Sequence, residues 1–199
     1  LMTRIAVFLS GHGTNMEALA EKIHSGELEA EIIFAASDNP DAVGLERAAA
    51  LGIETKRYPF LLNGRTACEE EMARDIEKER IDWIVLAGFM RILSPEFVSR
   101  FSGKIINIHP SLLPAFPGKD AIGQAWRYGV KVTGVTVHLV DERVDHGPIL
   151  AQEAIPVETG ETVESLESRI HEIEHRLYWQ TLSNLFNGKI QFSERGSKS

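Results

Sequence analysis

The chain has 199 residues, 43% hydrophobic and 25% charged, a composition typical of a globular protein with a sizeable core. Its formal net charge of −8 and the lack of a basic stripe argue against nucleic-acid binding. The single cysteine, Cys68, excludes an intramolecular disulfide, and no apolar run approaches the ~20 residues of a membrane span. We expect one cytoplasmic domain over 1–199, without nucleic-acid or membrane partners and with mobile ends at 1–2 and 193–199; monomer and homodimer both stay open.

Apolar segments of strand length alternate with amphipathic helical patterns through the first half of the chain. Nearly continuous apolar strands separated by helices are typical of a parallel sheet that is covered on both faces. The predicted strands are 4–10, 30–38, 81–88 and 104–109, and the predicted helices are 15–25, 42–51, 66–80 and about 95–102.

The pattern changes in the last third of the chain. Segment 131–140 alternates between apolar and polar residues, and 148–157 follows after a short loop, which predicts an antiparallel hairpin. A long helix is predicted over 162–187, with Thr162 as a candidate cap and Gly188 as the stop. The predicted fold class is therefore α/β: a doubly wound, mostly parallel sheet with helices on both faces and an antiparallel C-terminal extension.

The first predicted turn, "LSGHGTNMEAL" at 9–19, joins the first strand to the first helix. Its glycines let backbone N–H groups turn toward an anion, and the N-terminus of the helix adds partial positive charge. The third glycine of the dinucleotide fingerprint and the Walker lysine are missing, so a monophosphate fits better than NAD or ATP. A tight turn capped by Asn15, without a ligand, is the alternative. The candidate phosphate-binding residues are Gly11, His12, Gly13, Thr14 and Asn15.

Two polar residues, Asn107 and His109, interrupt the apolar segment 104–109. Residues two apart on a strand point to the same side, so both face one cleft while Ile106 and Ile108 pack on the other side. Open α/β sheets bind ligands at this carboxyl edge. An amide and a protonated imidazole are two donors, as an oxyanion on an attacked carbonyl requires. A polar pair that only ties down a loop is the alternative.

A carboxylate close to His109 would favour its protonated form. Segment 140–148, "VDERVDHGP", follows a predicted strand and offers Asp141, Glu142 and Asp145. We select Asp145, which directly precedes a His-Gly-Pro turn. A second turn is predicted where Leu113 meets Pro114, with a cis peptide bond between them.

The motif "HEIEH" at 171–175 matches the H-E-x-x-H pattern of zinc peptidases, with Glu194 as a conceivable third ligand. Both histidines lie more than about 90° from the apolar stripe of the predicted helix, and Glu194 falls in the polar tail. We therefore expect no metal site. Glu174 lies about 40° from Ile170 around the helix, near the edge of the stripe, where it could reach a cleft.

Two further candidates carry weaker signals. Segment 87–95, "AGFMRILSP", follows an apolar strand, so its backbone lines the same ligand edge. Arg65 opens the charged helix and is either a solvated charge or a contact for an anionic substrate.

Four motifs in this order, "LSGHGTN", "VLAGFMRILSP", "INIHPSLLPAFPG" and "VHLVDERVDHGPI", resemble the phosphoribosylglycinamide formyltransferases. The resemblance covers nearly the whole chain. It implies formyl transfer from 10-formyltetrahydrofolate to the amine of glycinamide ribonucleotide, with small-molecule substrates, the folate as a co-substrate and no metal.

The same resemblance assigns roles to individual positions. It implies that Asn107, His109 and Asp145 are catalytic, that the first turn takes the ribose 5-phosphate, and that Glu174 lies near the sugar and glycinamide. The folate-binding residues that it implies are Arg65, Met90, Arg91, Ile92, Leu93, Asn107, Val140 and Asp141.

The sequence departs from one familiar form of the family at 119–122, where some members carry histidines, and at Trp179, where a proline is common. Formyltetrahydrofolate deformylases and methionyl-tRNA formyltransferases are the alternatives among enzymes. The former add an N-terminal domain and the latter a C-terminal one, and we expect neither here. A regulatory protein that binds a nucleotide phosphate without catalysis is the alternative outside enzymes.

Overall fold

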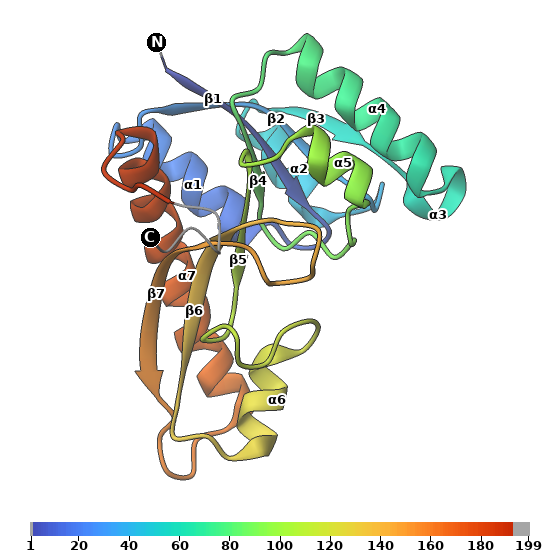
Figure 1. The fold of residues 1–199 in the computed structure, drawn as a ribbon. Coiled ribbons are helices and arrows are strands. Elements are labelled where there is room, and N and C mark those ends of the chain that lie inside the picture. The colour runs from blue at the N-terminus through green and yellow to red at the C-terminus, as the bar shows by residue number, and fades with distance from the viewer. Residues whose placement is uncertain (1, 193–199) are drawn as a thin grey trace, which may run out of the picture.

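The computed structural model describes residues 2–192, which form a sheet with helices on both faces (Figure 1). The predicted mobile ends, apart from Met2, and the candidate ligand Glu194 lie outside the described residues. The strands are β1 (Thr3–Leu9), β2 (Ala30–Ser37), β3 (Glu54–Arg57), β4 (Trp83–Leu86), β5 (Ile105–His109), β6 (Val132–Leu139) and β7 (Ile149–Pro156). The helices are α1 (Thr14–His24), α2 (Val43–Ala50), α3 (Phe60–Asn63), α4 (Arg65–Lys78), α5 (Pro95–Arg100), α6 (Ala121–Tyr128) and α7 (Val163–Phe186).

The seven strands lie in the order β3-β2-β1-β4-β5-β6-β7. The first five strands in this order pair in parallel, whereas β6 pairs antiparallel with both β5 and β7. The predicted fold class, including the antiparallel extension, is confirmed. The change of direction at β5 brings a parallel strand and an antiparallel strand to either side of Asn107 and His109.

Side chains that alternate along the strands supply two cores. Along β1, Val7 and Leu9 enter the core beneath α1, α2 and α7, whereas Phe8 enters the core beneath α3, α4 and α5. On β5, Ile106 and Ile108 enter the first core, as predicted, and Ile105 enters the second. This packing holds β5 from both faces and fixes which side its polar residues occupy.

Several predicted boundaries are confirmed. Thr162 precedes α7 and its hydroxyl accepts a hydrogen bond from the Ser165 N–H at 3.2 Å, while Gly188, with φ 68°, follows its end. The peptide bond between Leu113 and Pro114 is cis. Among residues 2–192, no helix combines the length and the apolar character needed to cross a membrane.

Three short elements, β3, α3 and α6, were not predicted from the sequence. β3 has the sequence Glu-Thr-Lys-Arg. It lacks an apolar pattern because it is an edge strand whose side chains are half-buried or exposed. α3 has four residues, too few to show helical periodicity. α6 lies between residues with left-handed backbone, Asp120 and Gly129, after a stretch rich in proline and glycine.

Tyr178 connects helix α7 to the sheet. Its side chain is fully buried, and its hydroxyl lies 2.8 Å from the Leu86 carbonyl oxygen and 3.2 Å from that of Ile106. Burial and the charge of Glu174 raise the pKa of this phenol well above its ordinary value, so the hydroxyl keeps its proton and donates. Tyr178 thus ties α7 to the backbone of β4 and β5.

Replacing Tyr178 by phenylalanine is expected to lower the free energy of unfolding by roughly 1–3 kcal/mol, since two buried carbonyl groups lose a shared donor. Urea denaturation followed by circular dichroism measures this change. Thr181→Val is the matched control, because the Thr181 hydroxyl is also buried but bonds only within α7, to the Leu177 carbonyl at 2.7 Å. Equal losses in the two variants would contradict this role of Tyr178.

Candidate active site

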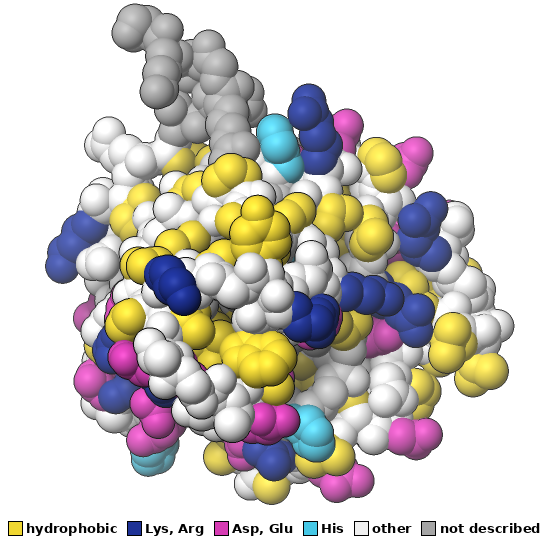
Figure 2. Space-filling view, turned by 90° about the horizontal axis from the view of Figure 1, so that it is seen from below, with side chains coloured by type: hydrophobic (Ala, Val, Ile, Leu, Met, Phe, Trp, Pro, Cys, Tyr) yellow, Lys and Arg dark blue, Asp and Glu magenta, His cyan; other side chains and the backbone are white. Residues whose placement is uncertain are grey.

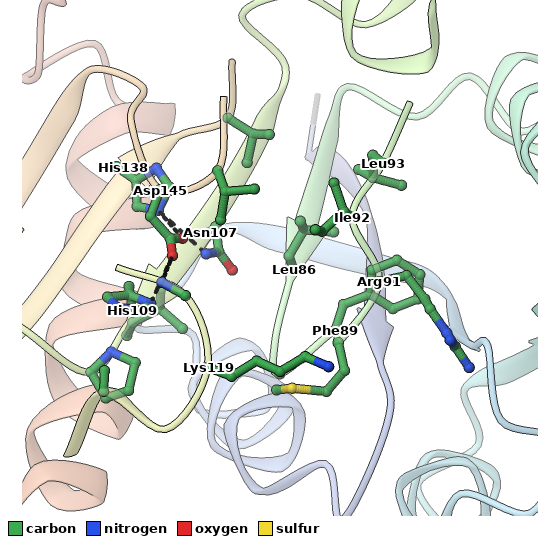
Figure 3. A pocket seen from close by; sticks show the side chains of 18 of the residues that line it. Leu86, Phe89, Arg91, Ile92, Leu93, Asn107, His109, Lys119, His138 and Asp145 are labelled. Carbon is green, nitrogen blue, oxygen red and sulfur yellow. Dashed lines mark hydrogen bonds and ion pairs between the residues drawn. The ribbon is translucent and has the colours of Figure 1, made fainter. Parts of the chain in front are cut away.

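Asn107 and His109 face the same side of β5 and line a cavity of about 470 Å³ at the carboxyl edge of the sheet. Asp145, in the loop between β6 and β7, lines the same cavity. Its Oδ2 lies 3.5 Å from His109 Nδ1, and both side chains are at most one-tenth exposed. The structure therefore brings together the three residues that the sequence analysis selected, as Figure 3 shows.

The surroundings of Asp145 favour the charged form of its carboxylate. Burial opposes its ionisation, but the neighbouring His138 side chain, the hydrogen bond from the Gly118 N–H and the charge of His109 outweigh burial and lower the pKa of the Asp145 carboxyl. The Gly118 N–H donates to Asp145 Oδ2 at 2.7 Å. Asp145 itself has φ 51°, in the left-handed region, which turns its side chain back toward His109.

His138 of β6 is a site residue that the sequence analysis missed. Its side chain is 1% exposed, and it pairs across the sheet with Asn107. Nδ1 donates to the Leu139 carbonyl at 2.8 Å, so Nε2 of the neutral ring can accept from Asn107 Nδ2 at 3.3 Å. Asp145 Oδ1 lies 3.7 Å from the same Nε2. A signal was present, because His138 is a polar residue inside the alternating segment 131–140, but its partner depends on the strand register.

His109 has an acceptor at each ring nitrogen. Nε2 lies 2.8 Å from the Phe116 carbonyl oxygen, and Nδ1 faces Asp145. Only the protonated imidazolium carries a hydrogen on both nitrogens and can donate to both partners. The arrangement thus favours a charged imidazolium whose two N–H groups are both engaged by the protein, so that it can act on an oxyanion through its positive charge. The Phe116 carbonyl is a further contact that the sequence did not reveal, since it depends on the path of the loop after Pro114.

The first turn brings backbone groups to the start of α1. Gly13, with φ 74°, is the N-cap residue of α1, while Asn15 lies inside the helix and does not cap it. Gly44 of α2 packs against this turn: its N–H donates to the Gly11 carbonyl at 2.9 Å, and a Cβ placed on it would lie 2.7 Å from Leu9 Cδ1. Gly11, His12 and Thr14 are exposed, so the N–H groups of the turn and the first helical residues are open to an anion.

Glu174 of α7 lies next to Asn15 of this turn. It is 6% exposed, and burial raises the pKa of its carboxyl to about 7, with a hydrogen bond from Asn15 acting against the rise and the charge of Glu167 adding to it. His171 Nε2 lies 3.8 Å from Glu174 Oε2. His171 and Glu167 also line the cavity at Asn107 and His109, which the sequence analysis did not anticipate.

Glu174→Gln is expected to stabilise the free protein most at pH 8. The folded state binds the carboxyl proton more tightly than the unfolded state, so burial of Glu174 costs most above pH 7 and nothing well below pH 4.5. The gain at pH 8 is expected to reach up to about 3 kcal/mol and to shrink as the pH falls from 7 to 4.5. Urea denaturation at a series of pH values measures it; a gain independent of pH would contradict the titration.

The residues proposed for folate divide into two groups. The first group lines the cavity with Asn107 and His109 and comprises Met90, Arg91, Ile92, Leu93, Val140 and Asp141. Arg65 does not: it lines a separate hollow with Ser94 and Arg100. α4 begins at Arg65, and the hollow that this residue lines does not include Asn107 or His109.

The departure at 119–122 lies at the cavity wall. Lys119, Asp120, Ala121 and Ile122 all line the cavity. Figure 3 shows the Lys119 side chain crossing from the His109 side toward the side that carries Phe89 and Arg91. This part of the wall therefore offers a cation to a ligand.

The residues of the HEIEH motif do not converge on one point. His171 is half exposed and Glu174 is buried, while burial and the charge of His171 lower the pKa of His175. Within residues 2–192, no three His, Cys, Asp or Glu side chains are grouped as metal ligands. The motif instead contributes His171 to the cavity and Glu174 to the first turn.

Comparison with known proteins defines the class to which this fold and site belong. The sequence profile described as formyl transferase matches residues 3–182, and the chain belongs to this family. Over 199 residues it is 41% identical to the phosphoribosylglycinamide formyltransferase of Bacillus subtilis (strain 168), with 100% of both chains covered. It is also 41% identical, over 97% of its length, to the human trifunctional purine biosynthetic protein adenosine-3, of which it spans 19%.

Solved structures agree with this assignment. The glycinamide ribonucleotide transformylase 1 of Geobacillus kaustophilus superimposes with a TM-score of 0.89 at 49% identity, over 93% of this chain and 99% of that one. The phosphoribosylglycinamide formyltransferase of Bacillus halodurans superimposes with a TM-score of 0.89 at 44% identity, over 94% of this chain and 97% of that one.

Proposed function

We propose that this chain transfers the formyl group of 10-formyltetrahydrofolate to the amine of 5'-phosphoribosylglycinamide, a step of purine biosynthesis. The observation that carries the proposal is the convergence of Asn107, His109 and Asp145 on one wall of the cavity. Relatives that match the chain along its whole length bear the name of this activity.

The chemistry follows from the donors on this wall. The amine attacks the formyl carbon, and the electron pair of the C=O bond moves onto the formyl oxygen. Asn107 Nδ2–H donates to this oxyanion, and the positive charge of the protonated His109 stabilises it, because such electrostatic groups act most strongly where charge develops. The attacking nitrogen then loses a proton, N10 of the folate gains one, and the bond between the formyl carbon and N10 breaks. Asp145 keeps His109 charged and can pass the proton through a water molecule.

His138 has a supporting role in this scheme. By accepting from one N–H of the Asn107 amide, it orients that amide and leaves the second N–H to the oxyanion. The side chain is enclosed by the sheet and has its other nitrogen bonded to the backbone, so its ring cannot turn freely.

The two substrates fit different parts of the site. The phosphate of the acceptor suits the exposed N–H groups at Gly11 to Asn15, and its sugar suits the neighbouring Glu174. The flat pterin ring suits the apolar wall at 90–93, and the acidic tail of the folate suits Lys119 and Arg143, which also line the cavity. In Figure 2, basic side chains lie beside hydrophobic ones across the face viewed. Folate is thus a co-substrate, and a cytoplasmic location fits such substrates and the single, buried thiol of Cys68.

The acceptor distinguishes this function from its alternatives. Formyl transfer from 10-formyltetrahydrofolate is measured with glycinamide ribonucleotide, with glycine and with water alone. Formylated ribonucleotide as the dominant product supports the proposal. Release of formate at the same rate in all three mixtures would indicate a deformylase, and no turnover in any of them would indicate a regulatory binding protein.

A further inference from the structure

A buried carboxylate outside the catalytic group, Asp38, follows the carboxyl end of β2. It is 5% exposed, and its two oxygen atoms have different partners. Oδ1 accepts from the Ser10 hydroxyl at 2.5 Å, and Oδ2 accepts from Arg91 Nε at 2.6 Å. A buried charge with both oxygen atoms engaged holds those partners in place, since losing either bond leaves it incompletely compensated.

Ser10 extends this contact to the backbone of the cavity wall. Its hydroxyl accepts from the Met90 N–H at 2.8 Å while donating to Asp38, and its own N–H donates to the Gly88 carbonyl at 3.0 Å. Ser10 also immediately precedes Gly11, the first residue of the proposed phosphate-binding turn. A single carboxylate is therefore bonded to the start of one proposed subsite and to the wall of the other.

The wall at 88–92 is anchored in the second core by Phe89, whose ring centre lies 5.7 Å from that of Phe8, but its next residues have few other anchors. Met90 and Ile92 are 62% and 63% exposed, so their side chains add little packing to hold the segment. Figure 3 shows Arg91 directed away from Asn107 and His109. Its guanidinium lies 5.9 Å from the centre of the Phe60 ring and reaches Asp38 rather than the catalytic wall. Beyond Phe89, the positions of Met90 and Arg91 thus depend on Ser10 and Asp38.

We propose that Asp38 and Ser10 are positioning residues that fix the first turn against the 88–92 wall and so hold the formyl donor and its acceptor in alignment. This inference rests on the proposed function, because it assigns one substrate to each side of the cluster. Displacement of bound reactants by as little as about 1 Å can cost on the order of 10²-fold in rate. Loss of the cluster should therefore affect transfer more than the binding of either substrate alone.

The first test is Asp38→Ala. With both substrates saturating, kcat is expected to fall by about ten-fold or more, by the cost of misalignment. Dissociation constants for tetrahydrofolate and for glycinamide ribonucleotide, each measured alone by calorimetry, are expected to change by less than about three-fold, because each subsite stays intact. Asp38→Asn keeps an acceptor for Ser10 and is expected to recover part of the lost rate.

Asp75→Ala is the matched control. Asp75 also accepts from a buried partner, the Tyr58 hydroxyl at 2.7 Å, and pairs with Lys56 at 3.5 Å, but it lies on α4 away from the cavity. Thermal unfolding of each variant separates loss of stability from loss of alignment. A kcat that falls equally in Asp75→Ala and Asp38→Ala, or that stays unchanged in Asp38→Ala, would overturn the inference.

Ser10→Ala provides a second test and serves if Asp38→Ala does not fold. Ser10→Ala is expected to lower kcat in the same direction, with Ser10→Thr restoring activity through its hydroxyl. The double variant is expected to lose little more than Asp38→Ala alone, since both changes break one chain of hydrogen bonds. Additive losses would contradict the shared role. A wild-type protein that transfers no formyl group to the ribonucleotide would instead overturn the proposed function.

Discussion

Asn107→Ala is expected to lower kcat for formyl transfer by about 10²–10³-fold, the usual effect of removing one donor to an oxyanion. The amide contacts the reacting oxygen only when charge develops, so KM for either substrate should change far less than kcat. Steady-state kinetics with each substrate varied in turn measures both constants. His138 would lose its hydrogen-bonding partner, so unfolding by urea is measured in parallel.

Asn187→Ala is the control for this variant. Asn187 directly follows α7, where its amide lies 3.5 Å from the Ser183 hydroxyl, outside the cavity lining. Its kcat is expected to equal that of the wild type. An Asn107→Ala enzyme that retains more than about a third of the wild-type kcat would contradict the assignment of this residue as an oxyanion donor.

Asp145→Asn is expected to lower kcat by about 10²-fold, the lower range of general acid–base effects. The amide cannot favour the charged form of His109, although it preserves the size of the side chain. In the wild type, the lowered pKa keeps Asp145 ionised throughout pH 5–8, so its own titration should not appear in the rate profile over that range. In the variant, His109 loses its charged partner, so the rate should fall more steeply as the pH rises from 5 to 9. Rates measured from pH 5 to 9 test both statements.

Asp82→Asn controls for removing an aspartate that accepts a backbone hydrogen bond. Asp82 Oδ2 accepts from the Arg4 N–H at 2.8 Å, much as Asp145 accepts from Gly118, but it precedes β4 at the opposite edge of the sheet. Its rate profile is expected to match that of the wild type. An Asp145→Asn enzyme with the wild-type profile would contradict a role of this carboxylate in holding the charge of His109.

The strands and the catalytic residues on β5 could be predicted because both depend on local periodicity. Residues two positions apart on a strand point to the same side, so Asn107 and His109 had to share one face of β5. The parallel arrangement then brings the carboxyl ends of the strands to one edge. Asp145 could be selected on chemical grounds, because a carboxylate was needed near the His109 imidazole and the segment 140–148 offered one.

The partners of these residues could not be predicted, because they depend on geometry between distant segments. His138 lies opposite Asn107 only in the observed register of β6 against β5. The Phe116 carbonyl reaches His109 because the chain turns back after Pro114, with Phe116 itself at φ 50°. Similarly, Asp38 carried no local signal, and its contact with Ser10 requires β1 and β2 to end side by side.

Arg65 as a folate contact stays a prediction, and the structure places it apart from the other residues predicted for folate. Its charge suits a folate tail, but α4 carries it into a different hollow from the catalytic cavity. The cations that do line the cavity, Arg91, Lys119 and Arg143, come from loops whose paths the sequence alone did not define. The structure was therefore needed more to assign electrostatic roles than to predict which residues of the strands face the site.

Transfer of a ¹³C-labelled formyl group tests the central claim most directly. One equivalent of labelled 10-formyltetrahydrofolate is mixed with excess enzyme and glycinamide ribonucleotide, and the products are followed by NMR. The account predicts that the label appears on the amine of the ribonucleotide and that Asn107→Ala slows its appearance by about 10²–10³-fold. Label recovered as formate, or transferred at an unchanged rate by the Asn107→Ala enzyme, would contradict it.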